Sequence, residues 1–68
     1  MRIEEIWEEV MGKTIAKYTD KIQLINHTLY ITTAVAPLKN ELVFQKEKII
    51  ERINEAMKEK LVKEVVIK

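Results

Sequence analysis

Apolar residues recur at intervals of three and four over the first eighteen residues of the chain, which is the spacing that puts side chains on one face of a helix. Glutamates occupy the first half of this stretch and lysines the second, an order that stabilises a helix through its dipole. The pattern therefore predicts one helix over residues 3–18, closed by Thr19 and Asp20. Its apolar positions are Ile3, Ile6, Trp7, Val10, Ile15 and Tyr18.

The next stretch alternates apolar and polar residues, as a strand with one buried face does. If Asn26 and His27 form a two-residue turn, where Asn tolerates a positive φ, the flanking residues pair as a hairpin. This register places aliphatic side chains on one face and polar or amphipathic side chains on the other. The inner set is Ile22, Leu24, Leu29 and Ile31, and the outer set is Lys21, Gln23, Tyr30 and Thr32.

A second helical pattern follows the hairpin and precedes a third strand. Pro37 suits the first turn of a helix, because its missing N–H is no loss there. The pattern continues to about Glu59, but Phe44 points roughly 140° away from the apolar stripe at about 100° per residue. Either the helix breaks near residues 43–46, or Phe44 faces something other than this stripe. The β-branched residues over 61–68 predict the third strand.

These elements follow the order helix, strand, strand, helix and strand. A helix between the second and third strands returns the chain to one sheet by a right-handed crossover, so that both helices cover the same face. The predicted fold is α+β, a two-layer sandwich whose three-stranded sheet is covered on one face by helices. With 68 residues and neither repeats nor linkers, the chain is predicted to form one domain over residues 1–68.

Gly12 and Trp7 are the one glycine and the one tryptophan of the chain, and both lie in the predicted first helix. Gly inside a helix costs roughly 1 kcal/mol relative to Ala. We expect Gly12 to offset this cost by letting the helix pack closely on the sheet or on the second helix, so that Gly12→Leu destabilises the fold strongly. Trp7 is expected to anchor the core rather than to form an exposed contact.

The composition argues against most enzyme classes. The chain has no Cys and no Ser, which excludes disulfides and leaves Thr and Lys as the common nucleophile types. Its single glycine cannot form a phosphate loop, and a single His makes a zinc site implausible. We interpret His27 as a solvated turn residue and the glutamates of the first helix as dipole partners rather than metal ligands. The sequence thus predicts no enzyme activity, no cofactor and no metal.

Charge and hydropathy are those of an ordinary globular chain. The net charge of +1 gives no overall bias toward nucleic acid. Apolar runs are far shorter than the roughly 20 residues that span a bilayer. The beginning of the chain is acidic and periodic, unlike a signal peptide. We therefore expect a cytoplasmic protein that does not bind a membrane.

Lysines gather near the end of the first helix and the start of the first strand. They form a candidate patch for single-stranded nucleic acid, in which lysines hold phosphates and an aromatic ring stacks on a base. The alternative is a mixed, solvated surface. The candidate residues are Lys13, Lys17, Lys21, Tyr30 and Lys63.

Phe44, together with Lys48, is the candidate contact for a protein partner. An apolar side chain on the outer side of its helix suits a protein partner or a dimer interface. The alternative is a helix break that buries Phe44.

Several motifs, taken in order, resemble a known family. The chain opens with Trp7-x-x-Val10-x-Gly12-x-x-Ile15-Ala16-x-x-Thr19 and continues with Thr28-Leu29-Tyr30-Ile31, Glu41-Leu42 and Ile49-Ile50-x-x-Ile53-Asn54. With the β-branched strand that follows, this order resembles the DciA-like family of bacteria, long catalogued as a domain of unknown function. The resemblance covers essentially all 68 residues.

The resemblance implies a fold like the type II KH domain and a part in bacterial DNA replication. It implies a loader or recruiter of the replicative helicase that contacts single-stranded DNA and has no catalytic residues. KH domains proper grip nucleic acid with a Gly-x-x-Gly loop, whereas this chain has one glycine. The leading hypothesis is a non-enzymatic binding module, monomeric or weakly homodimeric, with a helicase partner. The alternatives are an RNA- or ribosome-associated KH-like module and a purely structural homodimer.

Overall fold

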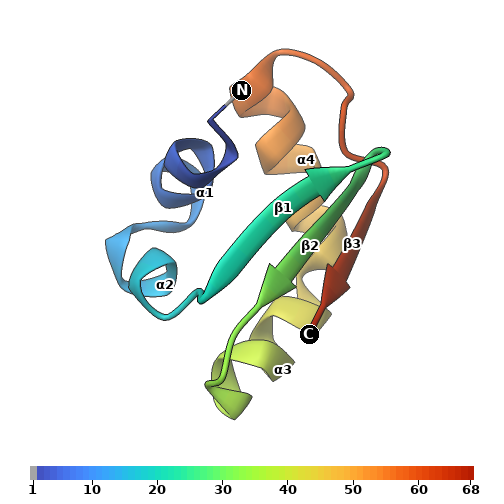
Figure 1. The fold of residues 1–68 in the computed structure, drawn as a ribbon. Helices are drawn as coiled ribbons and strands as arrows, with labels where there is room; N and C mark the ends of the chain where they lie inside the picture. The colour runs from blue at the N-terminus through green and yellow to red at the C-terminus, as the bar shows by residue number, and fades with distance from the viewer. Residues whose placement is uncertain (1) are drawn as a thin grey trace.

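A computed structural model describes residues 2–68 of the chain. Its strands form one sheet of order β1-β2-β3 (Figure 1). The α+β order of helix, strand, strand, helix and strand is confirmed, except that each of the two predicted helices is divided in two. The elements are α1 (Ile3–Met11), α2 (Lys13–Lys17), β1 (Lys21–Ile25), β2 (Thr28–Thr32), α3 (Ala36–Phe44), α4 (Lys46–Met57) and β3 (Glu64–Ile67).

β1 and β2 form the hairpin in the register predicted from the sequence. Ile25 pairs with Thr28 next to the turn, and the antiparallel pairing continues to the other end of both strands. Asn26 and His27 have φ values of 47° and 66°. Two positive φ values are typical of a type I′ turn, whose twist matches that of the strands it joins. The predicted inner face is the buried one, with Leu29 fully buried at its centre.

β3 lies beside β2 and runs parallel to it. Val65 pairs with Leu29, so the buried face of the hairpin continues onto β3. The strand begins at Glu64 rather than at Leu61, because the first residues of the predicted strand belong to the connection from α4.

The hairpin turn also holds the beginning of β3. The backbone N–H groups of Lys63 and Glu64 donate to the carbonyl oxygen of His27 at 2.8 and 3.2 Å. The Nδ1 atom of His27 lies 2.8 Å from the carbonyl oxygen of Leu61, a hydrogen bond that requires the ring proton on Nδ1. His27 is exposed on the turn, as predicted, and it also connects the turn to the third strand.

The hydrophobic core lies between the sheet and the helices. Figure 1 shows α4 crossing behind the sheet and α1 beside β1, while the face of the sheet toward the viewer carries no helix from residues 2–68. The prediction that helices cover one face is confirmed. Every helix in this range is too short or too polar to cross a membrane. The buried core residues are Trp7, Leu29, Ile31, Leu42, Ile49, Ile53, Val62 and Val65.

The first helical stretch is interrupted at Gly12, so the prediction of one continuous helix over residues 3–18 is wrong. Gly12 separates α1 from α2 with φ 93° and ψ 162°, a region of backbone conformation that is essentially limited to glycine. A Cβ atom at this position would meet nothing within 4 Å. The expected close approach of another backbone is therefore also wrong, and the glycine is needed for its positive φ. Helical spacing continued across the break because α1 and α2 pack against the same core.

Trp7 connects α1 to the end of α2. Its side chain is buried, and its Nε1–H donates to Thr19 Oγ1 at 3.0 Å. The Thr19 hydroxyl donates in turn to the carbonyl oxygen of Ile15 at 2.8 Å. The indole thus has its apolar body in the core and its polar edge satisfied. These bonds hold α1 and α2 together across the glycine.

The second helical stretch breaks within residues 43–46, as one of the two alternatives predicts. α3 ends at Phe44 and α4 begins at Lys46, with Gln45 between them at φ −107° and ψ 16°. The break does not bury Phe44, whose side chain is 87% exposed. Both alternatives therefore hold, since the helix breaks and Phe44 also faces away from the apolar stripe.

Candidate functional site

The structure divides the predicted basic patch between two ends of the sheet. Lys13 and Lys17 lie on α2, which leads into β1 at Lys21. These three lysines therefore lie near one end of the sheet. Lys63 lies at the other end, where its N–H bonds to His27 of the hairpin turn. β1 spans five residues between these ends, which is about 15 Å at the usual rise of a strand. Lys63 is therefore not brought together with the other predicted residues.

Lys68, which the sequence reasoning missed, lies near Tyr30. Its backbone N–H donates to Ile31 at 2.7 Å and its carbonyl accepts from the N–H of Thr33 at 3.1 Å, which fixes it beside the end of β2. Its Nζ stands 5.1 Å from the centre of the Tyr30 ring, within the range of a cation–π contact. The signal that would have found Lys68 is the parallel register of β3 against β2, and local sequence patterns do not contain it.

A second lysine–tyrosine pair lies near the same end. The Nζ of Lys17 is 5.9 Å from the centre of the Tyr18 ring. The buried hydroxyl of Thr33 donates to the carbonyl oxygen of Tyr18 at 2.6 Å, which ties the end of α2 to the end of β2. Both tyrosines of the chain thus have a lysine beside their rings. We call this surface the basic end and define it by Lys17, Tyr18, Lys21, Tyr30 and Lys68.

Phe44 and Lys48 lie together where α3 meets α4. Both line a shallow hollow of about 290 Å³, whose rim also carries Glu47 and Glu51. Val43, which precedes Phe44, is itself 46% exposed. The two exposed apolar side chains end α3, and Lys48 adds a positive charge in the first turn of α4. We call this the junction surface and define it by Val43, Phe44 and Lys48.

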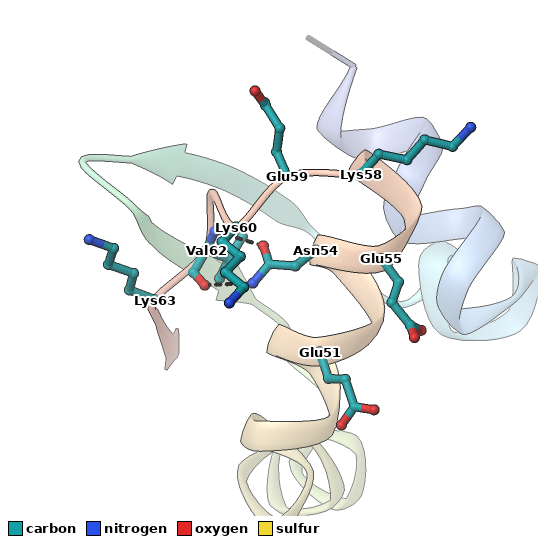
Figure 2. A pocket seen from close by; sticks show the side chains of 8 residues that line it. All are labelled: Glu51, Asn54, Glu55, Lys58, Glu59, Lys60, Val62 and Lys63. Carbon is teal, nitrogen blue, oxygen red and sulfur yellow. Dashed lines mark hydrogen bonds between the residues drawn. The ribbon is translucent and has the colours of Figure 1, made fainter.

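A larger hollow, about 570 Å³, lies between the end of α4 and the segment that leads to β3 (Figure 2). The Asn54 side chain crosses from the helix to this segment. Its Nδ2–H donates to the carbonyl oxygen of Val62 at 2.9 Å, and its Oδ1 accepts from the N–H of Val62 at 2.8 Å. Figure 2 shows the charged side chains of Lys58, Glu59 and Lys63 pointing outward from the rim. The two hydrogen bonds of Asn54 thus connect α4 to the segment before β3 at this hollow.

No three His, Asp or Glu side chains of residues 2–68 are placed together as metal ligands.

The sheet, the helices and the exposed residues together define a small α+β module with an open mixed sheet and two exposed candidate contact surfaces. The family model described as Dna[CI] antecedent, DciA, matches residues 1–67. The chain belongs to the DciA family.

DciA proteins are helicase loaders or recruiters and not a known enzyme family, so this chain fits a module of the helicase-loader kind in DNA replication. A comparison with curated proteins gives no match. A comparison with solved structures gives none either.

Proposed function

We propose that the chain is a non-enzymatic binding module that contacts a replicative helicase through the junction surface and single-stranded DNA, weakly, through the basic end. The observation that carries the helicase contact is the exposure of Phe44, which is 87% accessible while Trp7 is buried. Membership of the DciA family supports the class of partner. A large apolar side chain left in water favours a protein contact.

The junction surface has the properties of a small, preorganised contact. Burial of a Phe side chain contributes about 1.5–3 kcal/mol, and aromatic side chains often dominate the energy of an interface. Leu42 is fully buried two residues before Phe44 and fixes the end of α3 on the core. Because the backbone beneath Phe44 is already held, little conformational freedom is lost on binding.

Phe44→Ala is expected to weaken binding to the replicative helicase by about 30-fold, because truncating a central aromatic side chain costs about 2 kcal/mol. The measurement is isothermal titration of this chain into the purified helicase of the same organism. The stability of the variant should stay within about 0.5 kcal/mol of the parent, since Phe44 makes no buried contact to lose.

The matched control is Ile25→Ala. It removes another exposed apolar side chain, 48% accessible, from the hairpin instead of the junction. We expect it to bind the helicase as tightly as the parent. Equal affinity of Phe44→Ala and the parent would rule out the junction surface.

The basic end supports the weaker contact with DNA. Lys17, Lys21 and Lys68 are exposed and supply positive charge. Tyr18 is 47% exposed and Tyr30 is half-buried on the uncovered face of the sheet. Phosphates bind to lysines and bases stack on aromatic rings, without need of a particular sequence. With a net charge of only +1, binding should be modest and strongly dependent on salt.

Raising salt from about 50 to about 200 mM is expected to weaken binding of a labelled oligo(dT) roughly 20-fold, if each lysine of the basic end neutralises one phosphate. Fluorescence anisotropy measures the slope. The triple variant Lys17→Gln, Lys21→Gln, Lys68→Gln should bind more weakly and with a flatter slope. The control variant Lys58→Gln, Lys60→Gln, Lys63→Gln loses the same charge at the other end of the molecule. Identical slopes in the two triple variants would contradict the assignment.

A further inference from the structure

β1 is an edge of the sheet, with β2 on one side and no strand of residues 2–68 on the other. The pair Ile25 and Thr28 flanks the two-residue turn and so exchanges both backbone hydrogen bonds, and bonded pairs alternate from there. Ile22 and Leu24 therefore direct their N–H and C=O groups away from β2. Within the described chain, no other backbone group bonds to them. Such an edge is ready to pair with another strand.

A hollow of about 490 Å³ lies along the first half of this edge. β1 lines one side of it with residues 21–23, and α1 lines the other with Glu4, Trp7 and Glu8. The outward backbone groups of Ile22 thus border open space rather than a packed helix. Trp7 also lines the hollow, although its side chain is only 1% exposed.

The charges of this hollow favour a basic ligand. Glu4 and Glu8 lie one turn apart on α1, are exposed, and form no ion pair with any residue from 2 to 68. Asp20 also lines the hollow, but its Oδ2 already accepts a hydrogen bond from the N–H of Ala34 at 3.0 Å. Lys21 is the one cation among the lining residues, so acidic groups outnumber it.

We propose that an extended peptide with basic side chains binds along β1 as an added strand. Its main chain bonds to the outward N–H and C=O groups of Ile22 and Leu24, while a Lys or Arg on its α1 side lies beside Glu4 and Glu8. Main-chain bonds give affinity in this mode of recognition, and alternate side chains give selectivity. The site shares only Lys21 with the basic end and nothing with the junction surface, so it stands apart from the proposed function.

The probe is a fluorescein-labelled peptide of alternating Lys and Val, roughly six residues long to match a strand. Anisotropy at physiological salt is expected to show binding that the double variant Glu4→Lys, Glu8→Lys weakens by at least about tenfold, through like-charge repulsion. The matched control Glu5→Lys, Glu9→Lys makes the same charge change on residues of α1 that do not line the hollow. If both double variants lost the same affinity for the peptide, the overall charge of the protein would account for the attraction, and the proposal would be overturned.

The backbone bonds are tested with amide exchange by NMR. Bound peptide should slow exchange of the Ile22 and Leu24 amides, while that of Gln23, which pairs with Tyr30 of β2, should not change. Alternate amides of a strand point to opposite edges. N-methylation of the peptide amides that face β1 should therefore abolish binding, whereas N-methylation of the amides on the other edge should leave binding intact. Unchanged exchange at Ile22 and Leu24, tolerance of methylation on both edges, or a dimer of this chain already paired through β1 would each overturn strand addition.

Discussion

Asn54→Ala is expected to lower the free energy of unfolding by about 2–4 kcal/mol, because two hydrogen bonds are lost and two backbone groups of Val62 are left without partners. Val62 is 2% exposed, so water does not readily replace the amide. The midpoint and slope of urea denaturation measure the change.

Two further variants sharpen this result. Asn54→Asp keeps the acceptor for the Val62 N–H but sets a carboxylate oxygen against the Val62 carbonyl, so it should destabilise about as much as Asn54→Ala. Asn40→Ala removes an exposed asparagine of α3 and should leave stability within about 0.5 kcal/mol of the parent. If Asn54→Ala melted like Asn40→Ala, the segment before β3 would be held by apolar packing alone.

Gly12→Leu is expected to cost about 1–3 kcal/mol through backbone strain, because φ 93° with ψ 162° is essentially closed to L-residues. Crowding adds nothing, since the space around the missing Cβ is open. Gly12→Ala should therefore cost nearly as much as Gly12→Leu, as measured by chemical denaturation.

A D-alanine at position 12, introduced by chemical synthesis, separates strain from space. D-residues favour the mirror-image conformation, so this variant should match the parent or exceed its stability. A loss as large as that of Gly12→Ala would mean that close packing, rather than φ, requires the glycine.

The hairpin was the most predictable element, because its geometry is local. A two-residue turn fixes every pair that follows, and only the register of Ile25 with Thr28 puts the aliphatic residues on one face. The third strand was harder to predict in detail. Its apolar character was visible, but its start at Glu64 depends on bonds to His27, far away in sequence.

The helix breaks show two different limits of periodicity. At Phe44 the helical spacing of apolar residues is interrupted, and this interruption predicts the break. At Gly12 the pattern continued unchanged, because α1 and α2 face the same core from either side of the break. The rare glycine is the signal of that break, and the sequence does not show that its positive φ, rather than close packing, is the reason for it. The spacing of apolar residues predicts which face of a helix is buried, but it does not predict the φ and ψ angles of a single residue.

The residue types of the two candidate surfaces can be picked out from the sequence, but which of these residues lie together cannot. Phe44 differs from the other apolar residues of its helical stretch in the direction in which it points, and its exposure follows from that direction. To predict which lysines form the basic patch, one must know at which end of the sheet each lysine lies. The crossover that makes β3 parallel to β2 carries Lys63 to the turn and Lys68 to Tyr30. Such long-range pairing has no local signature in the sequence.

The contacts of His27 bear on the order in which the chain folds. The hairpin closes locally and fast, whereas pairing of the last strand must first overcome the loop-closure entropy of the whole α3–α4 connection. Because the acceptor for the Lys63 and Glu64 amides is a carbonyl of the turn itself, it is in place only once the turn has formed. The turn therefore positions the start of β3, and a one-residue slip of this strand is opposed because it would expose Val65 to water and bury Glu64.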